Sequence, residues 1–153
     1  MLSAIVLVAG LSKRMGNNNK MLLPFKGKTV IASTVDNILA SGMNEIIVVT
    51  GFEHEKTQTA LQGLPVRLVH NPYFEKGMTS SVQKGVAHAA GDGYMICLGD
   101  MTQITPDEYA LLKNGFEKVY ATNKACICMP FYKGEKGNPV IFSRQYKDAI
   151  LQH

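Results

Sequence analysis

An early segment, LVAGLSKRMGNNNK at residues 7–20, combines glycines with several cationic side chains. Residues 1–35 hold five Lys or Arg and no Asp or Glu, so their net charge is +5. The net charge of the whole chain is +4, so the remaining residues sum to −1. Backbone N–H groups beside small residues, together with cations, suit the close approach of phosphate oxygens. The segment therefore predicts a pocket for a small polyanion, and the alternative interpretation is a solvated basic surface.

A carboxylate follows the apolar run YMICL, where Asp100 stands in YMICLGDM. Mg²⁺ is a hard cation that proteins usually hold with one or two carboxylates plus substrate phosphates. Asp100 is thus a candidate metal ligand, although an aspartate after a strand also serves as an ordinary turn or capping residue. By contrast, His54 and His70 have no recognisable partner in the sequence and are interpreted as solvated or structural.

A third polar group lies in NPYFEKGMTSSV, where Thr79, Ser80 and Ser81 stand at the start of a helical pattern after Gly77. Hydroxyls and unpaired backbone N–H groups gather at such a positive helix end, which favours an anion. Simple helix capping by the same hydroxyls is the alternative.

Apolar runs alternate with helical patterns along the chain, and this alternation predicts the fold. Most runs are continuously apolar, which is typical of strands buried on both faces of a sheet. Strand and helix in alternation favour a mostly parallel sheet with helices on both faces, in a single domain over residues 1–153. The predicted strands are 3–8, 45–50, 66–70, 94–98, 125–129 and 139–142, and the helical patterns are 29–42, 53–63, 78–91, 105–116 and 143–153.

Composition and glycine spacing argue against several classes of protein. The chain is 46% hydrophobic and 18% charged, as in soluble globular proteins, and no apolar run approaches the ~20 residues that span a bilayer. Basic residues gather around one loop, whereas proteins that coat nucleic acid spread them along a face. Three cysteines in apolar runs favour reduced thiols in a cytoplasmic protein. The loop matches neither G-x-x-x-x-G-K-[ST] nor G-x-G-x-x-G, which argues against a P-loop NTPase and a dinucleotide-binding dehydrogenase.

The segment LVAGLSKRMGNNNKMLLPFKGKTVI resembles the N-terminal signature of the MobA-like nucleotidyltransferases, most of all the molybdenum cofactor cytidylyltransferase branch. The resemblance extends through NPYFEKGMTSSVQKG, CLGDMTQIT and GEKGNPVIF, so it covers nearly the whole chain. It implies a Rossmann-like three-layer α/β sandwich of the nucleotide-diphospho-sugar transferase type. The signature falls on Leu7, Ala9, Gly10, Arg14, Met15, Gly16 and Lys20.

The resemblance also implies a catalytic set of Arg14, Lys20 and Asp100. Arg14 and Lys20 would neutralise phosphate oxygens, Asp100 would hold Mg²⁺, and the base and ribose would rest against the turn at residues 7–10. The implied nucleotide-binding set is Leu7, Ala9, Gly10, Arg14, Gly16, Lys20, Asn71 and Ser80.

The acceptor side is implied to include Asn138. The cytidylyltransferase branch typically has Gly-His-Pro where this chain has Gly137-Asn138-Pro139, so the histidine's role does not carry over. A side-chain amide still donates and accepts hydrogen bonds. A turn that leads into a strand is the alternative interpretation of these residues.

The reaction implied by the resemblance transfers CMP from CTP to the terminal phosphate of molybdopterin and releases pyrophosphate, with a molybdoenzyme or maturation factor as a possible partner. The guanylyl branch usually has Gly-Gly where this chain has Ala9-Gly10, which favours CTP. The alternatives are a guanylyltransferase, a sugar-phosphate nucleotidyltransferase, or a non-catalytic nucleotide-binding domain. Family members carry a later Gly-Asp segment that helps hold the metal, whereas this sequence ends at His153. We therefore expect nucleotide binding with weak pyrophosphate release.

Overall fold

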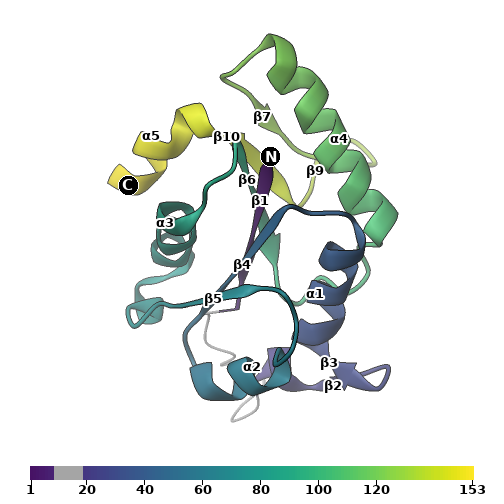
Figure 1. The fold of residues 1–153 in the computed structure, drawn as a ribbon, viewed down its shortest axis with the longest axis vertical. Coiled ribbons are helices and arrows are strands. Elements are labelled where there is room, and N and C mark those ends of the chain that lie inside the picture. Colours follow the sequence, from purple (N-terminus) through teal and green to yellow (C-terminus); the bar gives the residue numbers. More distant parts are fainter. Residues whose placement is uncertain (9–18) are drawn as a thin grey trace.

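A computed structural model describes residues 1–8 and 19–153, and a six-stranded sheet forms its centre (Figure 1). The strand order is β5-β4-β1-β6-β10-β7, in which β5, β4, β1 and β6 run parallel and β10 runs antiparallel to both of its neighbours. The predicted mostly parallel sheet is confirmed, with β10 as its antiparallel exception. The strands are β1 (Leu2–Leu7), β4 (Glu45–Thr50), β5 (Arg67–His70), β6 (Gly93–Leu98), β7 (Ile127–Cys128) and β10 (Val140–Ser143).

Helices cover both faces of this sheet, which confirms the three-layer α/β sandwich (Figure 1). One face is covered by α1 (Val30–Ala40), α2 (His54–Ala60) and α4 (Pro106–Thr122), and the other by α3 (Met78–His88) and α5 (Lys147–Gln152). None of the helices in the described ranges is long and apolar enough to cross a membrane.

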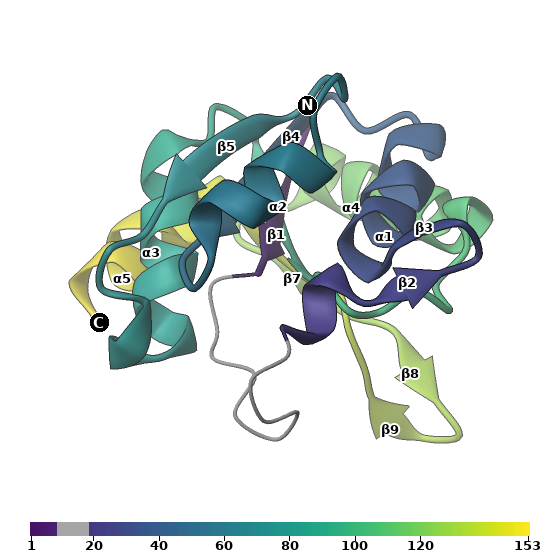
Figure 2. The ribbon, with the colours of Figure 1, turned by 90° about the horizontal axis from the view of Figure 1, so that it is seen from below.

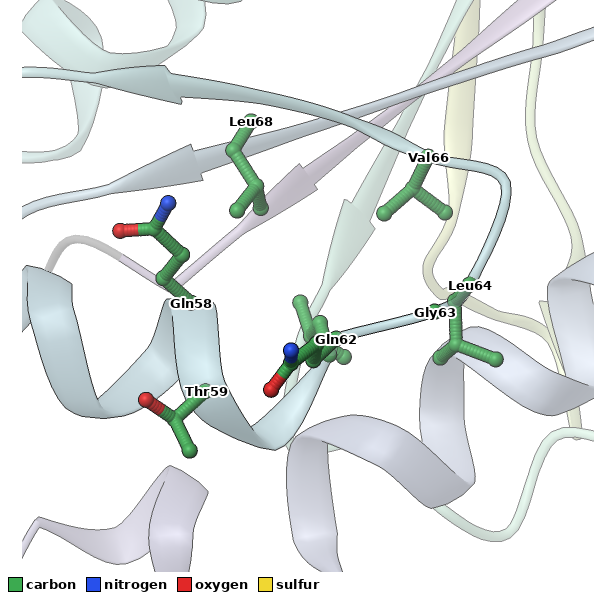
Figure 3. A pocket seen from close by; sticks show the side chains of 8 residues that line it. Gln58, Thr59, Gln62, Gly63, Leu64, Val66 and Leu68 are labelled. Carbon is green, nitrogen blue, oxygen red and sulfur yellow. The ribbon is translucent and has the colours of Figure 1, made fainter.

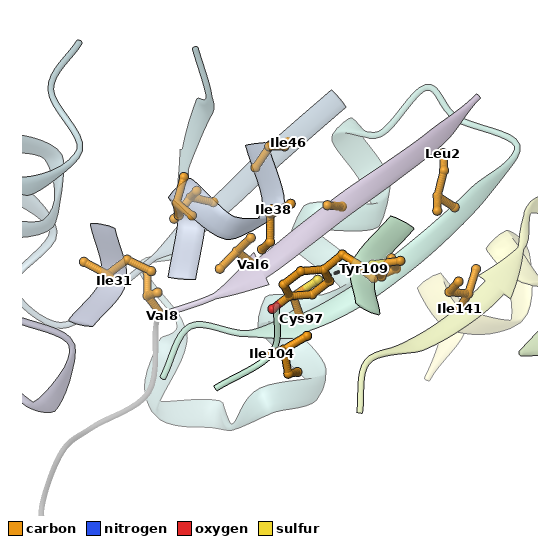
Figure 4. Close-up of a cluster of buried hydrophobic side chains, with 14 of the residues drawn as sticks. Leu2, Val6, Val8, Ile31, Ile38, Ile46, Cys97, Ile104, Tyr109 and Ile141 are labelled. Atoms are coloured by element: carbon orange, nitrogen blue, oxygen red, sulfur yellow. Dashed lines mark hydrogen bonds between the residues drawn. The ribbon is translucent and has the colours of Figure 1, made fainter. Parts of the chain in front are cut away.

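The position of β1 inside the sheet explains why its sequence is continuously apolar. Ala4 and Val6 belong to the core cluster under α1 and α4, in which Figure 4 labels Val6. Ile5 and Leu7 belong to the cluster under α3. All four side chains are buried, because successive residues of a strand point to opposite faces and both faces are covered.

Helix α3 lies close to the sheet, and a glycine permits this approach. A Cβ atom at Gly85 would come within 2.4 Å of Ile5 Cγ2 and 3.1 Å of Val49 Cγ2. The absent side chain lets the helix pack directly on β1 and β4, which fixes where its N-terminus stands.

Several short elements differ from the sequence prediction. Two small hairpins, β2–β3 (Pro24–Phe25 and Lys28–Thr29) and β8–β9 (Phe131–Tyr132 and Glu135–Lys136), had no strand pattern of their own. The strand predicted at 125–129 is reduced to two residues, and α4 continues past its predicted end at residue 116. The 3₁₀ helices are η2 (Lys20–Leu22), η3 (Phe74–Lys76) and η4 (Arg144–Tyr146).

Candidate active site

The carboxyl ends of the four parallel strands meet at one edge of the sheet (Figures 1 and 2). Hydrogen bonding continues beyond the strand ends, since Asn71 N–H donates to the Thr50 carbonyl at 2.7 Å and Gly99 N–H donates to the Leu7 carbonyl at 3.1 Å. These bonds bring Asn71 and the residue after Gly99 to the same edge. In open α/β sheets this edge is where ligands bind.

Two of the predicted catalytic residues, Lys20 and Asp100, meet at this edge. Lys20 Nζ lies 3.0 Å from Asp100 Oδ2, and their side chains are 52% and 28% exposed. Asn19 holds the turn that presents Lys20, because its side-chain oxygen accepts a hydrogen bond from Met21 N–H at 3.0 Å. Gly99 lets the chain before Asp100 pass beside β1, since a Cβ atom there would lie 2.4 Å from Val8 Cγ1.

A partly exposed ion pair of this kind contributes little to folding, typically ~0–1 kcal/mol. Both charged groups are partly exposed, so a ligand at this edge of the sheet can reach an ammonium and a carboxylate. Ala9, Gly10, Arg14 and Gly16 lie outside the described residues. Leu7 is described and ends β1, where its side chain is buried in the cluster under α3.

The described residues offer one carboxylate at the position predicted for the metal. No group of three or more His, Cys, Asp or Glu in the described ranges could hold a metal ion by itself. Asp100 fits the donor set that Mg²⁺ favours only when substrate phosphates supply further oxygens. A metal site here would thus be completed by the nucleotide.

Asn71 joins the end of β5 to the start of α3. Its Nδ2 donates to Ser80 Oγ and Ser81 Oγ, both at 3.0 Å, and its Oδ1 accepts from Tyr73 N–H at 3.0 Å. The side chain is 2% exposed, so these bonds orient the loop around it. The predicted contacts of Asn71 and Ser80 with a nucleotide stay predictions.

The N-terminus of α3 stands next to this loop. Ser80 Oγ donates within the loop, to the carbonyl of Gly77 at 2.9 Å or that of Tyr73 at 3.2 Å. No described side chain caps the helix at its N-cap residue, Gly77. The first N–H groups of the helix therefore keep the capacity to bind an anion.

Two histidines pair at the same edge, which the sequence did not indicate. The rings of His54 and His70 lie 4.4 Å apart between centroids, and Thr50 Oγ1 lies 2.5 Å from His54 Nδ1. Partial burial, then the charges of His54 and Lys84, lower the pKa of His70 from its ordinary value. The sequence could have indicated this pairing only if the strand order had been known, because His70 ends β5 and His54 follows the neighbouring strand β4.

A pocket of about 480 Å³ lies next to Met101, the residue after Asp100, on the side of α4 and the β8–β9 hairpin. It contains the predicted acceptor residue Asn138. Tyr132 OH donates to Glu108 Oε2 at 3.2 Å at this pocket. Its lining consists of Met101, Gln103, Ile104, Glu108, Tyr132, Gly137 and Asn138.

Another pocket, of about 420 Å³, lies between α2 and the start of β5 (Figure 3). Gln58, Gln62, Val66 and Leu68 contribute to its wall, and none of the described residues that line it is charged. It lacks cations and carboxylates for a phosphate or a metal. The 480 Å³ pocket is the better candidate for an acceptor site, because Met101, the residue after Asp100, lines it.

Comparison with known proteins agrees with this geometry. Residues 4–153 match the family of the MobA-like NTP transferase domain, so the chain belongs to this family of nucleotidyltransferases. The chain is 28% identical over 144 residues to the molybdenum cofactor cytidylyltransferase of Escherichia coli K12, covering 94% of this chain and 70% of that protein. It is 30% identical over 121 residues to a probable molybdenum cofactor guanylyltransferase of Methanosarcina mazei, covering 76% of this chain and 52% of that protein.

Solved structures share the fold. A nucleotidyl transferase from Methanothermobacter superposes with a TM-score of 0.83 at 27% identity, covering 100% of this chain and 76% of that one. Rv0371c of Mycobacterium tuberculosis, solved in complex with manganese, gives a TM-score of 0.83 at 21% identity and covers 99% and 76% of the two chains. The fold predicted from the sequence signature, the nucleotide-diphospho-sugar transferase type, is confirmed.

Proposed function

We propose that this protein transfers CMP from CTP to the terminal phosphate of a molybdopterin-type acceptor and releases pyrophosphate. The observation that carries the proposal is the Lys20–Asp100 pair, with Nζ and Oδ2 3.0 Å apart, at the ligand-binding edge of the sheet. Asp100 follows β6 at the sheet edge where β5 leads into α3, and the next residue, Met101, lines the 480 Å³ pocket that contains Asn138. We place the nucleotide phosphates at the pair and the acceptor in this pocket.

The nucleotide occupies the side of α3 in this proposal. Lys20 and Arg14 offset charge on the β- and γ-phosphates, and Leu7, Gly10 and the small residues near them support the base and ribose. Asn71 holds the neighbouring loop in place through its buried amide.

Asp100, together with the phosphate oxygens of CTP, would hold Mg²⁺. When bound, the ion would supply charge stabilisation to the phosphate oxygens. The manganese found with Rv0371c supports a divalent ion in this fold, and the choice of Mg²⁺ is part of our proposal.

The chemistry needs no nucleophile from the protein. An oxygen of the acceptor's terminal phosphate attacks the α-phosphorus of CTP, the bond from that phosphorus to the bridging β-oxygen breaks, and its electrons leave with pyrophosphate. Lys20 and Arg14 offset the charge that develops on the departing group. The acceptor pocket and the nucleotide loop contribute by alignment, since misplacement of reacting groups by ~1 Å can cost ~10²-fold in rate.

The choice of CTP over GTP rests on one feature of the sequence. The cytidylyltransferase and guanylyltransferase relatives are about equally similar to this chain, at 28% and 30% identity. Ala9-Gly10 stands where the guanylyl branch usually has Gly-Gly, which supports CTP. We place the reaction in the cytoplasm, with a molybdoenzyme or maturation factor as the recipient of the product.

Pyrophosphate release from CTP in the presence of Mg²⁺ and molybdenum-bound molybdopterin tests the proposal. We expect release that depends on the acceptor and exceeds that of an Asp100→Asn variant. GTP should support less release than CTP. If CTP binds but no pyrophosphate forms with the acceptor, the protein is a non-catalytic nucleotide-binding domain.

A further inference from the structure

One acidic side chain, Glu108, lines the pocket that contains Asn138. Glu108 is the one charged residue among the described residues around this pocket. Met101, which directly follows the proposed metal ligand Asp100, lines the same pocket. A carboxylate is an unexpected feature in a pocket for a phosphate-bearing acceptor, because it repels anions.

The two oxygens of Glu108 have different surroundings. Oε1 accepts from Thr105 N–H at 3.3 Å and from the Thr105 hydroxyl at 3.2 Å, and Glu108 N–H donates back to that hydroxyl. This capping box fixes the side chain at the start of α4. Among the described residues, Oε2 accepts a hydrogen bond from Tyr132 OH alone.

Tyr132 is held at the pocket by the hairpin β8–β9, which projects from the body of the molecule (Figure 2). A Cβ atom at Gly137 would lie 2.8 Å from Tyr132 Cδ2, so the ring packs against this glycine. Partial burial, then the hydrogen bond and charge of Glu108, raise the pKa of Tyr132, which keeps its hydroxyl a donor.

The bond from Tyr132 to Glu108 is weak by its geometry. Its oxygen–oxygen distance of 3.2 Å exceeds the ~2.5–3.0 Å usual for an O–H···O bond. Tyr132 is also 51% exposed, so its hydroxyl can move away into solvent. A ligand with a better donor can therefore take its place on Oε2.

We infer that Glu108 selects acceptors whose end remote from the reacting phosphate presents adjacent N–H donors, as the 2-amino-4-oxo edge of a pterin does. This inference rests on the proposed function, because it takes the pocket as the acceptor's. An amino group and a ring N–H can both donate to a carboxylate, and Asn138 can donate to the neighbouring carbonyl. Acceptors with a second anionic group at that end are disfavoured.

Titration calorimetry with pterin and with lumazine tests the inference without any reaction. Lumazine has the same bicyclic ring but carries oxygen in place of the 2-amino group. The wild-type protein should bind pterin about tenfold or more tightly than lumazine, as sites that hydrogen-bond a donor reject analogues that lack it. Glu108→Gln should reduce the preference at least fivefold, since it removes the negative charge.

Matched variants separate recognition from folding. Glutamine also serves at the third position of a capping box, so Glu108→Gln should keep its melting temperature. Asp107→Asn removes the same charge from the neighbouring position, which does not line the pocket, and should keep the preference. Tyr132→Phe frees Oε2 and should strengthen pterin binding.

Equal affinity of the wild-type protein for the two ligands, or no binding of pterin, would overturn the inference. A preference that survives in Glu108→Gln would also overturn it. A CTP titration of the same proteins distinguishes failure of this inference from failure of the proposed function. If CTP binds normally, any of these results contradicts the inference alone. If CTP does not bind, the proposed function and the inference are both contradicted.

Discussion

Lys20 and Asp100 come from segments 80 residues apart, and the fold brings their charged atoms to 3.0 Å. Such a partly exposed pair adds little stability, so its loss should alter ligand binding far more than folding. The sequence predicted Lys20 from the cationic glycine segment and the signature it resembles, and Asp100 from its place after an apolar strand. The details that depend on their neighbours, the support from Asn19 and the close passage at Gly99, emerged only from the structure.

The first prediction concerns Lys20. Lys20→Ala should weaken CTP binding by ~1.5–3 kcal/mol, typical of a charged hydrogen bond, and should leave cytidine binding nearly unchanged, because the proposed partner is phosphate. Titration calorimetry with both ligands measures this. Lys124→Ala removes the same charge beside Tyr120 and serves as the control. Equal losses for cytidine and CTP would contradict the phosphate role.

A second prediction concerns Asp100. Asp100→Asn preserves the shape of the side chain but removes its charge, so we expect a near-normal melting temperature and loss of the Mg²⁺ dependence of CTP binding. Titrations with and without Mg²⁺ measure the effect. Asp148→Asn, at an exposed position of α5, is the control. A variant at position 100 that keeps its Mg²⁺ dependence would leave Asp100 a turn residue.

The pairing of His54 with His70 gives a third prediction, on pH. The pKa of His70 is lowered from its ordinary value of 6.5, so the unfolded chain binds this proton more readily than the native protein does. The free energy of unfolding should then fall as the pH drops below about 6.5.

The matched variant is His54→Gln, which removes one charge that lowers the pKa of His70. It should raise that pKa toward its ordinary value and flatten the loss of stability at low pH. An NMR titration of the His70 ring, with urea unfolding at several pH values, measures both. An unchanged pKa in the variant would mean that His54 has no influence.

At the scale of elements, the approach of α3 to β1 gives a fourth prediction. Gly85→Ala should destabilise the protein by ~1–3 kcal/mol, because the added methyl group would overlap Ile5 and Val49. Gly115→Ala, on α4, has nothing within 4 Å of its added Cβ atom and should stabilise by up to ~1 kcal/mol. Urea denaturation of both variants measures the contrast. Equal effects would mean that α3 does not pack as described.

The same elements show what the sequence could predict. Continuous apolar runs identified β1, β4 and β6, and the helical pattern at 105–116 identified α4, whose N-cap Thr105 forms a full capping box. The two hairpins were missed because two-residue strands are too short to show a period. The antiparallel direction of β10 is set by its connection rather than by its composition. The sequence placed Glu108 only within a helical pattern, since its contact with Tyr132 depends on the hairpin β8–β9.

At the scale of the whole molecule, our proposal assigns nucleotide binding and acceptor binding to different parts of one sheet edge. The sheet edge at which Asp100 lies also holds the Asn71 loop before α3, and the pocket with Glu108 and Asn138 lies against α4. The chain spans 70% of the Escherichia coli cytidylyltransferase and 76% of the Methanothermobacter structure. The proposed reaction requires, before any transfer, that this chain bind a nucleoside triphosphate.

The measurement that tests this most directly is an equilibrium binding panel of CTP, GTP, ATP and UTP, each with and without Mg²⁺. We predict that CTP binds most tightly and that its affinity falls when Mg²⁺ is removed. If none of the four nucleotides binds in the presence of Mg²⁺, the central claim is contradicted.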